Sequence, residues 1–387
     1  MQQAGCGMAI IFALILRGGA LYCILFGMIT QVELFRELVN VRYIEAKAKS
    51  MPLFRTLQWA WFILAMIHTY GDNCHQFCLH HGHLVHFTQV TQYVEVIVFA
   101  LYCLIFVITV LTFKTGLIRF QIGQLVWALV TVALVVLQTK FLAKCALYGV
   151  FWFCFPMATV VSNDVFAYVC GMTCGKKFID APFLSLSPKK TWEGFIGAAI
   201  ITCIFSFFFP LLLADIPWFI CPVEKLSFIP QSLASVTCEP HPIFLPQEYI
   251  FSLPQYMVTG GGPMSSGWQW SEYSTVLRPI QLHGIAYGVF ASLVAPFGGF
   301  LASAIKRGYE IKDFDKIIPG HGGVMDRMDC QLIIHLFTYV HLNSFVIRSA
   351  TSLVGVSAIL GAAAKLSSED LAWVHQQLGI LLLEQKR

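Results

Sequence analysis

Long apolar runs separated by short polar segments make up most of this chain of 387 residues. Because about 20 apolar residues cross the hydrocarbon core of a bilayer as a helix, most of these runs predict membrane spans. We expect spans at 8–30, 94–113, 122–137, 146–161, 195–213, 285–305, 332–347 and 351–364, and a shorter run at 57–68. The pattern therefore predicts an all-α, polytopic membrane protein with about nine transmembrane helices.

The N-terminal run is too long for the apolar core of a secretory signal and lacks a small-residue cleavage site. We therefore expect it to be retained as the first span. The charged segment 33–49 that follows is expected to be a helical connector on the cytosolic side. At the other end, 365–387 has acidic residues near its start and apolar positions at helical spacing, which predicts an amphipathic tail, either a cytosolic helix or an interface contact, without a catalytic role.

Composition supports a membrane protein. Mean hydropathy is +0.70 and 57% of the residues are hydrophobic, values that do not describe a soluble globular protein. The formal net charge of +4 is small and gives no reason to expect a nucleic-acid partner. The bilayer is the first partner that the sequence implies.

One polar stretch, 303–329, lies between two apolar runs near the C-terminus. Only 12% of the chain is charged, yet this stretch is rich in charges of both signs. They are Lys306, Arg307, Glu310, Lys312, Asp313, Asp315, Lys316, Asp326, Arg327 and Asp329. A Pro-Gly-His-Gly-Gly turn at 319–323 interrupts it, and glycines allow backbone N–H groups to turn toward an anion. Cations, such a turn and acids that can hold a divalent metal together suit a di- or triphosphate.

The amino-acid sequence of this stretch resembles the signature of the phosphatidate cytidylyltransferases, in particular their eukaryotic branch. The pattern S-x-x-K-R-x4-K-D begins at Ser303, and P-G-H-G-G-x-x-D-R-x-D ends at Asp329. The similarity to this family continues upstream at 296–300, 186–194 and 163–164, and more loosely at 52–59. With about a dozen fixed positions, the match is more specific than a lone glycine motif.

The resemblance implies transfer of the cytidylyl group of CTP to phosphatidate, with Mg²⁺ as the cofactor. It implies catalytic roles for Asp326, Asp329, Asp313, Lys306, Arg307 and His321. Phosphate or substrate contacts are implied for Ser303, Lys312, Gly320, Gly322, Gly323, Arg327, Lys189 and Lys190. The implied metal ligands are Asp326, Asp329 and Asp164.

Two of these assignments also have a plain alternative. Asp164 lies in an apolar segment, where an ionisable residue usually marks a functional site but can also be a hydrogen-bonded structural acid. Lys189 and Lys190 precede an apolar run, so they suit either phosphate binding or a topological anchor. Bacterial relatives usually carry an acid close to the position of Gly298-Gly299, so the presence of a second cation stays open here.

The segment 215–279 is rich in Pro, Ser and Gly and separates 162–214 from 280–364. If the lysine pair and the polar stretch are both cytosolic, this insert is lumenal. Cys221 and Cys238 within it are then either a disulfide or two free thiols. We expect three regions: N-terminal helices at 1–161, a catalytic transmembrane region at 162–364, and a tail at 365–387.

A group of cysteines and histidines between Cys74 and His86 has spacings that zinc sites also show. A histidine-rich loop without metal is the simpler interpretation, and the family resemblance gives no ligand role to these residues. We therefore leave this group out of the predicted site.

Two other functions suit parts of the pattern: a CTP-dependent polyprenol kinase, and a transporter with buried charges. The match through the final D-R-x-D argues against the kinase, and the gathering of charges beside one membrane face argues against the transporter. The eukaryotic resemblance favours the endoplasmic reticulum as the location, and a homodimer is also considered.

Overall fold

The computed structural model describes residues 2–80, 85–181, 183–184, 187, 190–223, 226, 236–254, 270–318, 320, 322–347 and 375. The chain divides into two compact units, Met1–Tyr339 and Val340–Arg387. All of the features discussed below belong to the first unit, apart from the end of one C-terminal helix and the short element that follows it.

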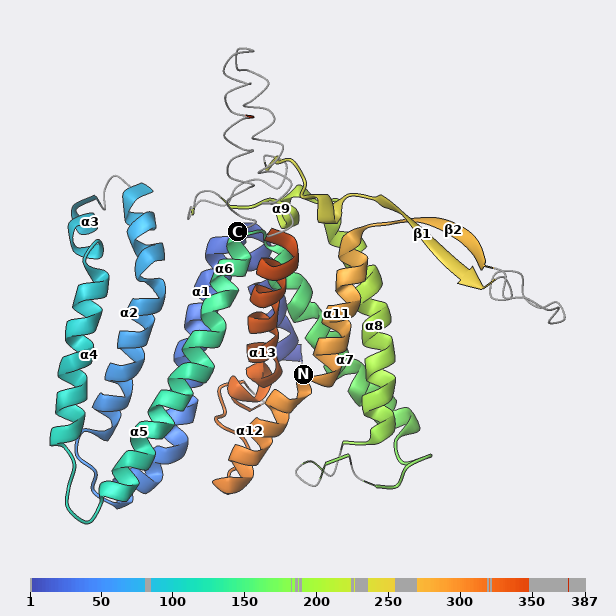
Figure 1. The fold of residues 1–387 in the computed structure, drawn as a ribbon. Coiled ribbons are helices and arrows are strands. Elements are labelled where there is room, and N and C mark those ends of the chain that lie inside the picture. Colours follow the sequence, from blue (N-terminus) through green and yellow to red (C-terminus); the bar gives the residue numbers. More distant parts are fainter. Residues whose placement is uncertain are drawn as a thin grey trace. The chain divides into compact units, whose positions relative to one another are not determined.

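The described residues are mostly helical (Figure 1). In chain order the elements are α1 (Gln2–Ala48), α2 (Phe54–His80), α3 (Val85–Thr91), α4 (Val94–Leu111), α5 (Ile118–Val132), η2 (Ala133–Leu137), α6 (Gln138–Leu147), α7 (Phe151–Cys174), α8 (Trp192–Ala214), α9 (Pro217–Ile220), η3 (Pro242–Phe244), β1 (Gln247–Pro254), β2 (Trp270–Leu277), α11 (Pro279–Leu293), α12 (Pro296–Gly308), α13 (Met325–His341) and η4 (Leu342–Ile347).

Seven segments within the described residues are long and apolar enough to cross a membrane. They are Arg17–Ala48, Val94–Leu111, Ile118–Leu147, Phe151–Cys174, Trp192–Ala214, Pro279–Gly308 and Met325–Ile347. The prediction of an all-α, polytopic protein is thus confirmed. The described residues contain seven candidate spans, whereas the sequence predicted about nine in the whole chain. The expected span at 351–364 lies outside the described residues, and α2 does not qualify as a span although its helix is longer than the predicted 57–68.

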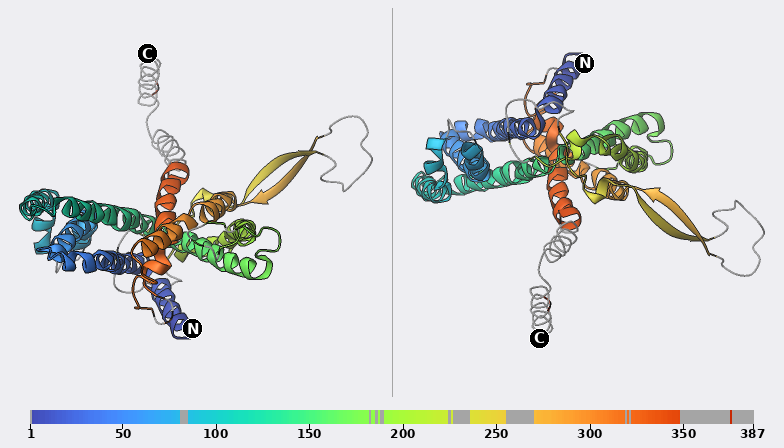
Figure 2. Two further views of the ribbon diagram at one scale, coloured as in Figure 1. Left: turned by 90° about the horizontal axis from the view of Figure 1, so that it is seen from below. Right: turned by 90° about the horizontal axis from the view of Figure 1, so that it is seen from above.

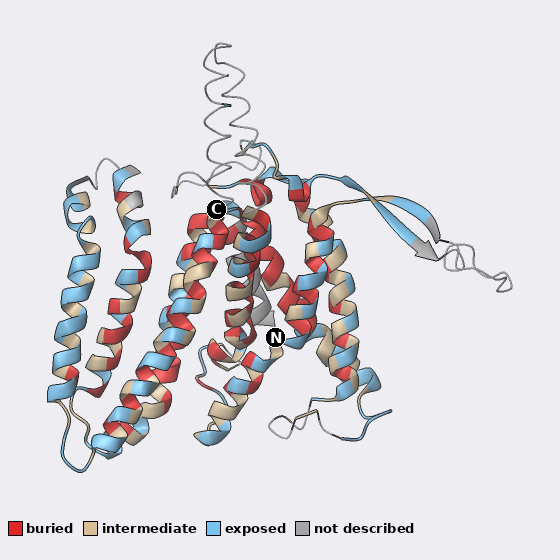
Figure 3. Cartoon of the chain, in the orientation of Figure 1, coloured by how far each residue is buried: buried red, intermediate tan, exposed pale blue. Residues whose placement is uncertain are grey.

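Helix α4 illustrates why the sequence pattern predicted spans so directly. Its side chains are strongly apolar, yet Thr109 is its one buried residue and most of the others are exposed (Figure 3). Exposed apolar surface of this extent is stable in contact with lipid, and a soluble protein rarely shows it.

Helix α1 differs from the prediction. The expected connector at 33–49 is a continuation of the same helix, which extends to Ala48 with a kink at Gly19 (φ 65°). Its residues Leu34, Phe35 and Leu38 are almost fully buried, in a cluster that also contains Met325 and Met328 of α13. The charged residues of this segment therefore lie on a packed helix, close to the start of α13.

Helices α7, α8 and α11 lie side by side (Figures 1 and 2). Small residues permit close approach, as is common between membrane helices. A Cβ atom at Gly284 of α11 would lie 2.1 Å from the carbonyl oxygen of Ser206 on α8. At the start of α8, a Cβ atom at Gly194 would lie 3.0 Å from the carbonyl oxygen of Ala167 on α7. The contact at Gly194 places the start of α8 against the segment of α7 that carries Asp164.

The insert between α8 and α11 contains the two strands, which the sequence did not predict. β1 and β2 form an antiparallel hairpin with Gln247 opposite Leu277 and Pro254 opposite Trp270. An ion pair of 2.7 Å between Asp215 and Arg278 joins the two ends of the insert. Cys221 and Cys238 form a disulfide, so the bridged alternative is the correct one. The insert lies at the C-terminal end of α8, opposite the end that follows Lys190.

Part of the cysteine and histidine group belongs to a helix and not to a loop. Cys74, His75 and Cys78 lie on α2, and Nδ1 of His75 is 2.7 Å from the Thr91 hydroxyl of α3. Residues 81–84 lie outside the described residues, and the described ones include no group of three potential metal ligands.

Candidate active site

The polar stretch 303–329 forms the last turns of α12, a loop at 309–324 and the first turn of α13. Lys306 and Arg307 occupy the last turn of α12, where cations favour the negative end of the helix dipole. The turn predicted at 319–323 is present: Gly320 and Gly322 have positive φ angles of 74° and 87°, and the N–H of Ile318 donates to the Gly322 carbonyl at 3.0 Å. Pro319 and His321 lie outside the described residues.

Asp326 organises this segment. Its Oδ1 accepts from Nζ of Lys306 at 2.6 Å, and its Oδ2 accepts from the N–H groups of Phe314 (3.1 Å) and Gly323 (3.0 Å). Only 6% of the Asp326 side chain is exposed. One carboxylate thus joins α12, the loop and the glycine turn. A metal ion would compete for it with Lys306.

A second carboxylate, Glu37 of α1, contacts the same turn and was not predicted. It accepts from the N–H groups of Val324 at 2.7 Å and Met325 at 2.8 Å. The sequence does hold a signal for it, because Glu37 shares a helix face with Leu34 and Val41 at helical spacing, and an acid on an apolar face needs a buried partner. Three N–H groups of the turn, those of residues 323–325, are therefore bonded to protein carboxylates.

A cavity of about 270 Å³ lies beside these residues. Its charged lining consists of three acids and two bases, Asp164, Asp326, Asp329, Lys190 and Arg327. The remaining lining residues are Ser187, Pro296, Gly299, Phe300, Ser303 and Cys330. The cavity therefore brings together parts of α7, the α7–α8 loop, α12 and α13.

The charges in this cavity are close enough to influence one another electrostatically. Lys190 and Arg327 attract the carboxylate of Asp164, and Asp164 and Asp329 repel one another. Lys306 attracts Asp329 as well as pairing with Asp326. Two mutually repelling acids that face a shared space are the arrangement that a divalent cation stabilises.

The α7–α8 loop is held so that Lys190 reaches this cavity. Oε1 of Glu193, in the first turn of α8, accepts from the N–H groups of Phe178 (3.0 Å) and Ile179 (2.8 Å). The Lys190 carbonyl accepts from Phe183, and the Thr191 hydroxyl caps α8 by accepting from Gly194 at 3.2 Å. Lys189 lies outside the described residues.

Ser303 and Gly299 form part of the α12 wall of the cavity, together with Pro296 and Phe300. The Ser303 hydroxyl donates to the Gly299 carbonyl at 2.8 Å, one helical turn earlier. A Cβ atom at Gly299 would lie 3.2 Å from Oδ2 of Asp329. The absence of a side chain at Gly299 therefore leaves space directly beside that carboxylate.

Several predicted residues do not line the cavity. Arg307, Lys312 and Asp313 are exposed on α12 and the loop. Oδ1 of Asp313 lies against the turn, 3.3 Å from the position of a Cβ atom on Gly322. Gly320, Gly322 and Gly323 shape the turn that precedes α13 and are absent from the lining.

A larger cavity of about 450 Å³ adjoins the first between α7 and α8. The two share Asp164, Ser187, Lys190, Pro296 and Phe300. The rest of its lining is mostly apolar and contains Ala167, Met172, Phe183, Phe195 and Ala198. Met172, close to the C-terminal end of the membrane-spanning helix α7, is 65% exposed, so the lining of this cavity reaches the outer surface of α7.

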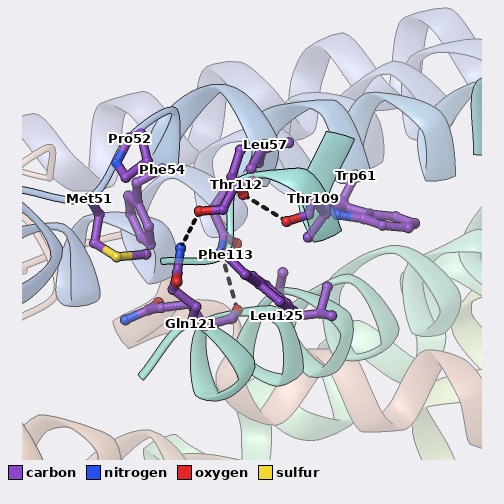
Figure 4. A pocket seen from close by; sticks show the side chains of 13 residues that line it. Met51, Pro52, Phe54, Leu57, Trp61, Thr109, Thr112, Phe113, Gln121 and Leu125 are labelled. Atoms are coloured by element: carbon purple, nitrogen blue, oxygen red, sulfur yellow. Dashed lines mark hydrogen bonds between the residues drawn. The ribbon is translucent and has the colours of Figure 1, made fainter. Parts of the chain in front are cut away.

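A third cavity, near the α1–α2 turn, has a different character. It measures about 40 Å³ and is bordered by Phe54, Trp61, Thr109, Gln121 and Leu125, among others (Figure 4). No charged residue lines it. Its size and lining rule it out as the place where a triphosphate binds.

The residues of the 270 Å³ cavity suit Mg²⁺. Mg²⁺ prefers oxygen ligands and is usually held by one or two carboxylates together with water and substrate phosphates. Asp164 and Asp329 supply such carboxylates. No group of three His, Cys, Asp or Glu side chains converges as a ready metal site among the described residues. The chemistry of the cavity thus fits a cation bound jointly by the protein and a phosphate substrate.

Comparisons with known proteins agree with this geometry. The profile of the cytidylyltransferase family matches residues 3–345. A probable phosphatidate cytidylyltransferase of Dictyostelium discoideum is 39% identical over 335 residues, which cover 87% of this chain and 68% of the relative. Phosphatidate cytidylyltransferase 1 of Arabidopsis thaliana is 35% identical over 347 residues (88% and 78%), and phosphatidate cytidylyltransferase 1 of Homo sapiens is 35% identical over 337 residues (87% and 69%).

The family match covers α1 and α7 as well as the polar stretch, so it includes every element that surrounds the charged cavity. The resemblance inferred from the sequence is confirmed. The chain belongs to the cytidylyltransferase family.

Proposed function

We propose that this chain transfers the cytidylyl group of CTP to phosphatidate, which yields CDP-diacylglycerol and pyrophosphate. The main observation is that the charged cavity shares a wall with a mostly apolar cavity between two membrane-spanning helices, α7 and α8. A reaction between a water-soluble nucleotide and a lipid needs both environments at one place. The names of the curated relatives, all phosphatidate cytidylyltransferases, support the same reaction.

The two cavities suggest where each substrate binds. Phosphatidate would place its acyl chains along Met172 and Phe195 in the apolar cavity, with its phosphate at the shared wall beside Lys190. The triphosphate of CTP would occupy the charged cavity near Arg327 and Lys306. Arg307 and Lys312, exposed on the same segment, are proposed as further phosphate contacts.

The reaction requires little proton transfer. A phosphate oxygen of phosphatidate attacks the α-phosphorus of CTP, and the bond from that phosphorus to the β-phosphate oxygen breaks as the new bond forms. The attacking oxygen is already anionic near neutral pH. The main obstacles are repulsion between two anions and the charge that develops on pyrophosphate. Lys190 and Arg327 in the cavity lining, and Lys306 bonded to Asp326, would lower this repulsion and stabilise the charge on pyrophosphate.

Asp164 and Asp329 are proposed to hold Mg²⁺, with Asp326 as a further ligand when Lys306 binds phosphate instead. Bound Mg²⁺ would neutralise phosphate charge and help align the reacting groups. Asp313 and the glycines of the turn are proposed to support this arrangement, because they contact the segment that leads into α13.

We also propose that the protein resides in the endoplasmic reticulum membrane with the charged cavity on the cytosolic side. The disulfide lies at the opposite end of α8 and needs an oxidising compartment such as the lumen. Lys306, Arg307 and Lys312 at the cavity end agree with the excess of basic residues on cytosolic faces. A homodimer is proposed in addition, and light scattering of the detergent-solubilised protein tests it.

Pyrophosphate release by the purified protein in mixed micelles tests the reaction. Release should require CTP, phosphatidate and Mg²⁺ together. Asp329→Asn should lower it by about 100-fold or more, the usual effect of removing one preorganised electrostatic contact. Glu248→Gln is the matched control, since Glu248 is exposed on β1 in the insert and should leave the rate unchanged. Release that does not depend on phosphatidate would contradict the proposal.

A further inference from the structure

Glu37 is an acid within a membrane-spanning helix, and it is completely buried (0% exposed). Its surroundings include Leu34, Leu38 and Met325, which are apolar and buried. Burying a carboxylate in such a place costs several kcal/mol unless hydrogen bonds compensate. The two hydrogen bonds that Glu37 accepts provide this compensation.

The two donors are the N–H groups of Val324, which directly precedes α13, and of Met325, the first residue of α13. N–H groups in the first turn of a helix have no partner within the helix, and the helix dipole makes that end positive. Glu37 thus acts as a helix cap supplied by α1, nearly three hundred residues away in sequence. Each of its oxygens holds one N–H group.

Gly323 makes this cap possible. A Cβ atom at this position would lie 2.6 Å from Oε2 and 2.7 Å from Oε1 of Glu37. No carboxylate could remain where it is beside such an atom. Position 323 therefore needs a glycine for two reasons: Gly323 is part of the turn, and it leaves space for the carboxylate of Glu37.

The cap is connected to the charged cavity although Glu37 does not line it. The N–H of Gly323 donates to Asp326, and Asp326 and Asp329 stand on the first turns of α13. The neighbouring Arg36 adds a second link, an ion pair of 2.7 Å with Asp315 in the loop. A shift in the start of α13 would therefore move both cavity carboxylates.

We infer that Glu37 is a positioning residue for cytidylyl transfer: by capping α13 across Gly323 it fixes Asp326 and Asp329 where Mg²⁺ and CTP bind. This inference rests on the proposed function for the nature of the ligands. It assigns a role at the site to a helix outside the region 162–364.

A double-mutant cycle tests the contact. Glu37→Ala and Gly323→Ala should each lower kcat/KM by about 10–100-fold, the usual cost of disturbing residues that orient ligands. In the double variant the alanine at 323 no longer meets a carboxylate, so kcat/KM should equal that of Glu37→Ala alone. Two independent sites would instead give effects that multiply.

Further readouts separate positioning from a purely structural role. In Glu37→Gln, which keeps one acceptor oxygen, the Mg²⁺ concentration for half-maximal activity should rise. Thermal stabilisation by Mg²⁺ and CTP without phosphatidate should fall, and amide hydrogen exchange over the start of α13 should accelerate. Glu45→Gln is the matched control, because Glu45 lies on the same helix and bonds only the exposed Lys49 among the described contacts.

Effects that multiply in the double variant, or an unchanged Mg²⁺ requirement and unchanged stabilisation in Glu37→Gln, would overturn the inference. A wild-type protein without phosphatidate-dependent turnover would refute the proposed function instead. In that case the ligand-induced stabilisation and the exchange rates still decide the role of Glu37.

Discussion

The contact between α12 and α13 gives a sharp prediction, because it is made by a glycine. A Cβ atom at Gly298 would lie 2.3 Å from the carbonyl oxygen of Asp329, whereas ordinary contact begins at 3.4 Å. In Gly298→Ala the two helices must therefore separate by about 1.1 Å at this point. Overpacking of this kind costs about 1–3 kcal/mol of stability. Because the contact is at Asp329 itself, the carboxylate moves with its backbone.

A displacement of about 1 Å at a catalytic position can lower the rate by about 100-fold. We expect Gly298→Ala to lose this much kcat/KM, measured by phosphatidate-dependent pyrophosphate release and corrected for the folded fraction from size-exclusion chromatography. Gly308→Ala is the matched control on the same helix, since a Cβ atom there meets nothing within 4 Å. If Gly298→Ala stays as active as Gly308→Ala, the packing of α12 on α13 does not set the position of Asp329.

Two further predictions concern stability. Lys306→Met leaves Asp326 buried without its cation, so the free energy of unfolding should fall by about 3 kcal/mol, at the lower end for a broken buried pair. Thermal melting measures this loss, and the melting temperature of Lys306→Arg should lie between those of Lys306→Met and the wild type. Replacing Cys221 and Cys238 by serine should cost about 3 kcal/mol for the short loop that the disulfide closes. CTP turnover at 25 °C should not change in this variant, because the disulfide lies at the opposite end of α8 from the charged cavity. A loss of turnover in the folded variant would contradict this placement.

The sequence predicted the membrane helices well where apolar residues continue without interruption. The predicted run at 195–213 differs from α8 by a few residues at its start and one at its end. The resemblance also pointed to Asp164, Lys190, Arg327 and Asp329, which meet at one cavity despite their separation in sequence. Neither periodicity nor composition could have brought these four together, because their contacts depend on how α7 packs against α12 and α13.

The sequence failed where a charge has a distant partner. Segment 33–49 has the composition of a solvated connector, yet Arg36 pairs with Asp315 and Glu37 caps α13. Nothing local to α1 reveals these partners. Asp326 shows the same limit, since its three donors occupy oxygens that the motif alone would leave to a metal. The β1–β2 hairpin was missed because 215–279 was interpreted from its Pro, Ser and Gly content.

The position of a radioactive label after turnover tests the central claim most directly. Purified protein would receive phosphatidate and CTP labelled with ³²P at either the α- or the γ-phosphate. Cytidylyl transfer predicts that only the α label enters the lipid, while the γ label leaves in pyrophosphate. Entry of the γ label into lipid would indicate a kinase, and no entry of either label in folded protein would contradict the account.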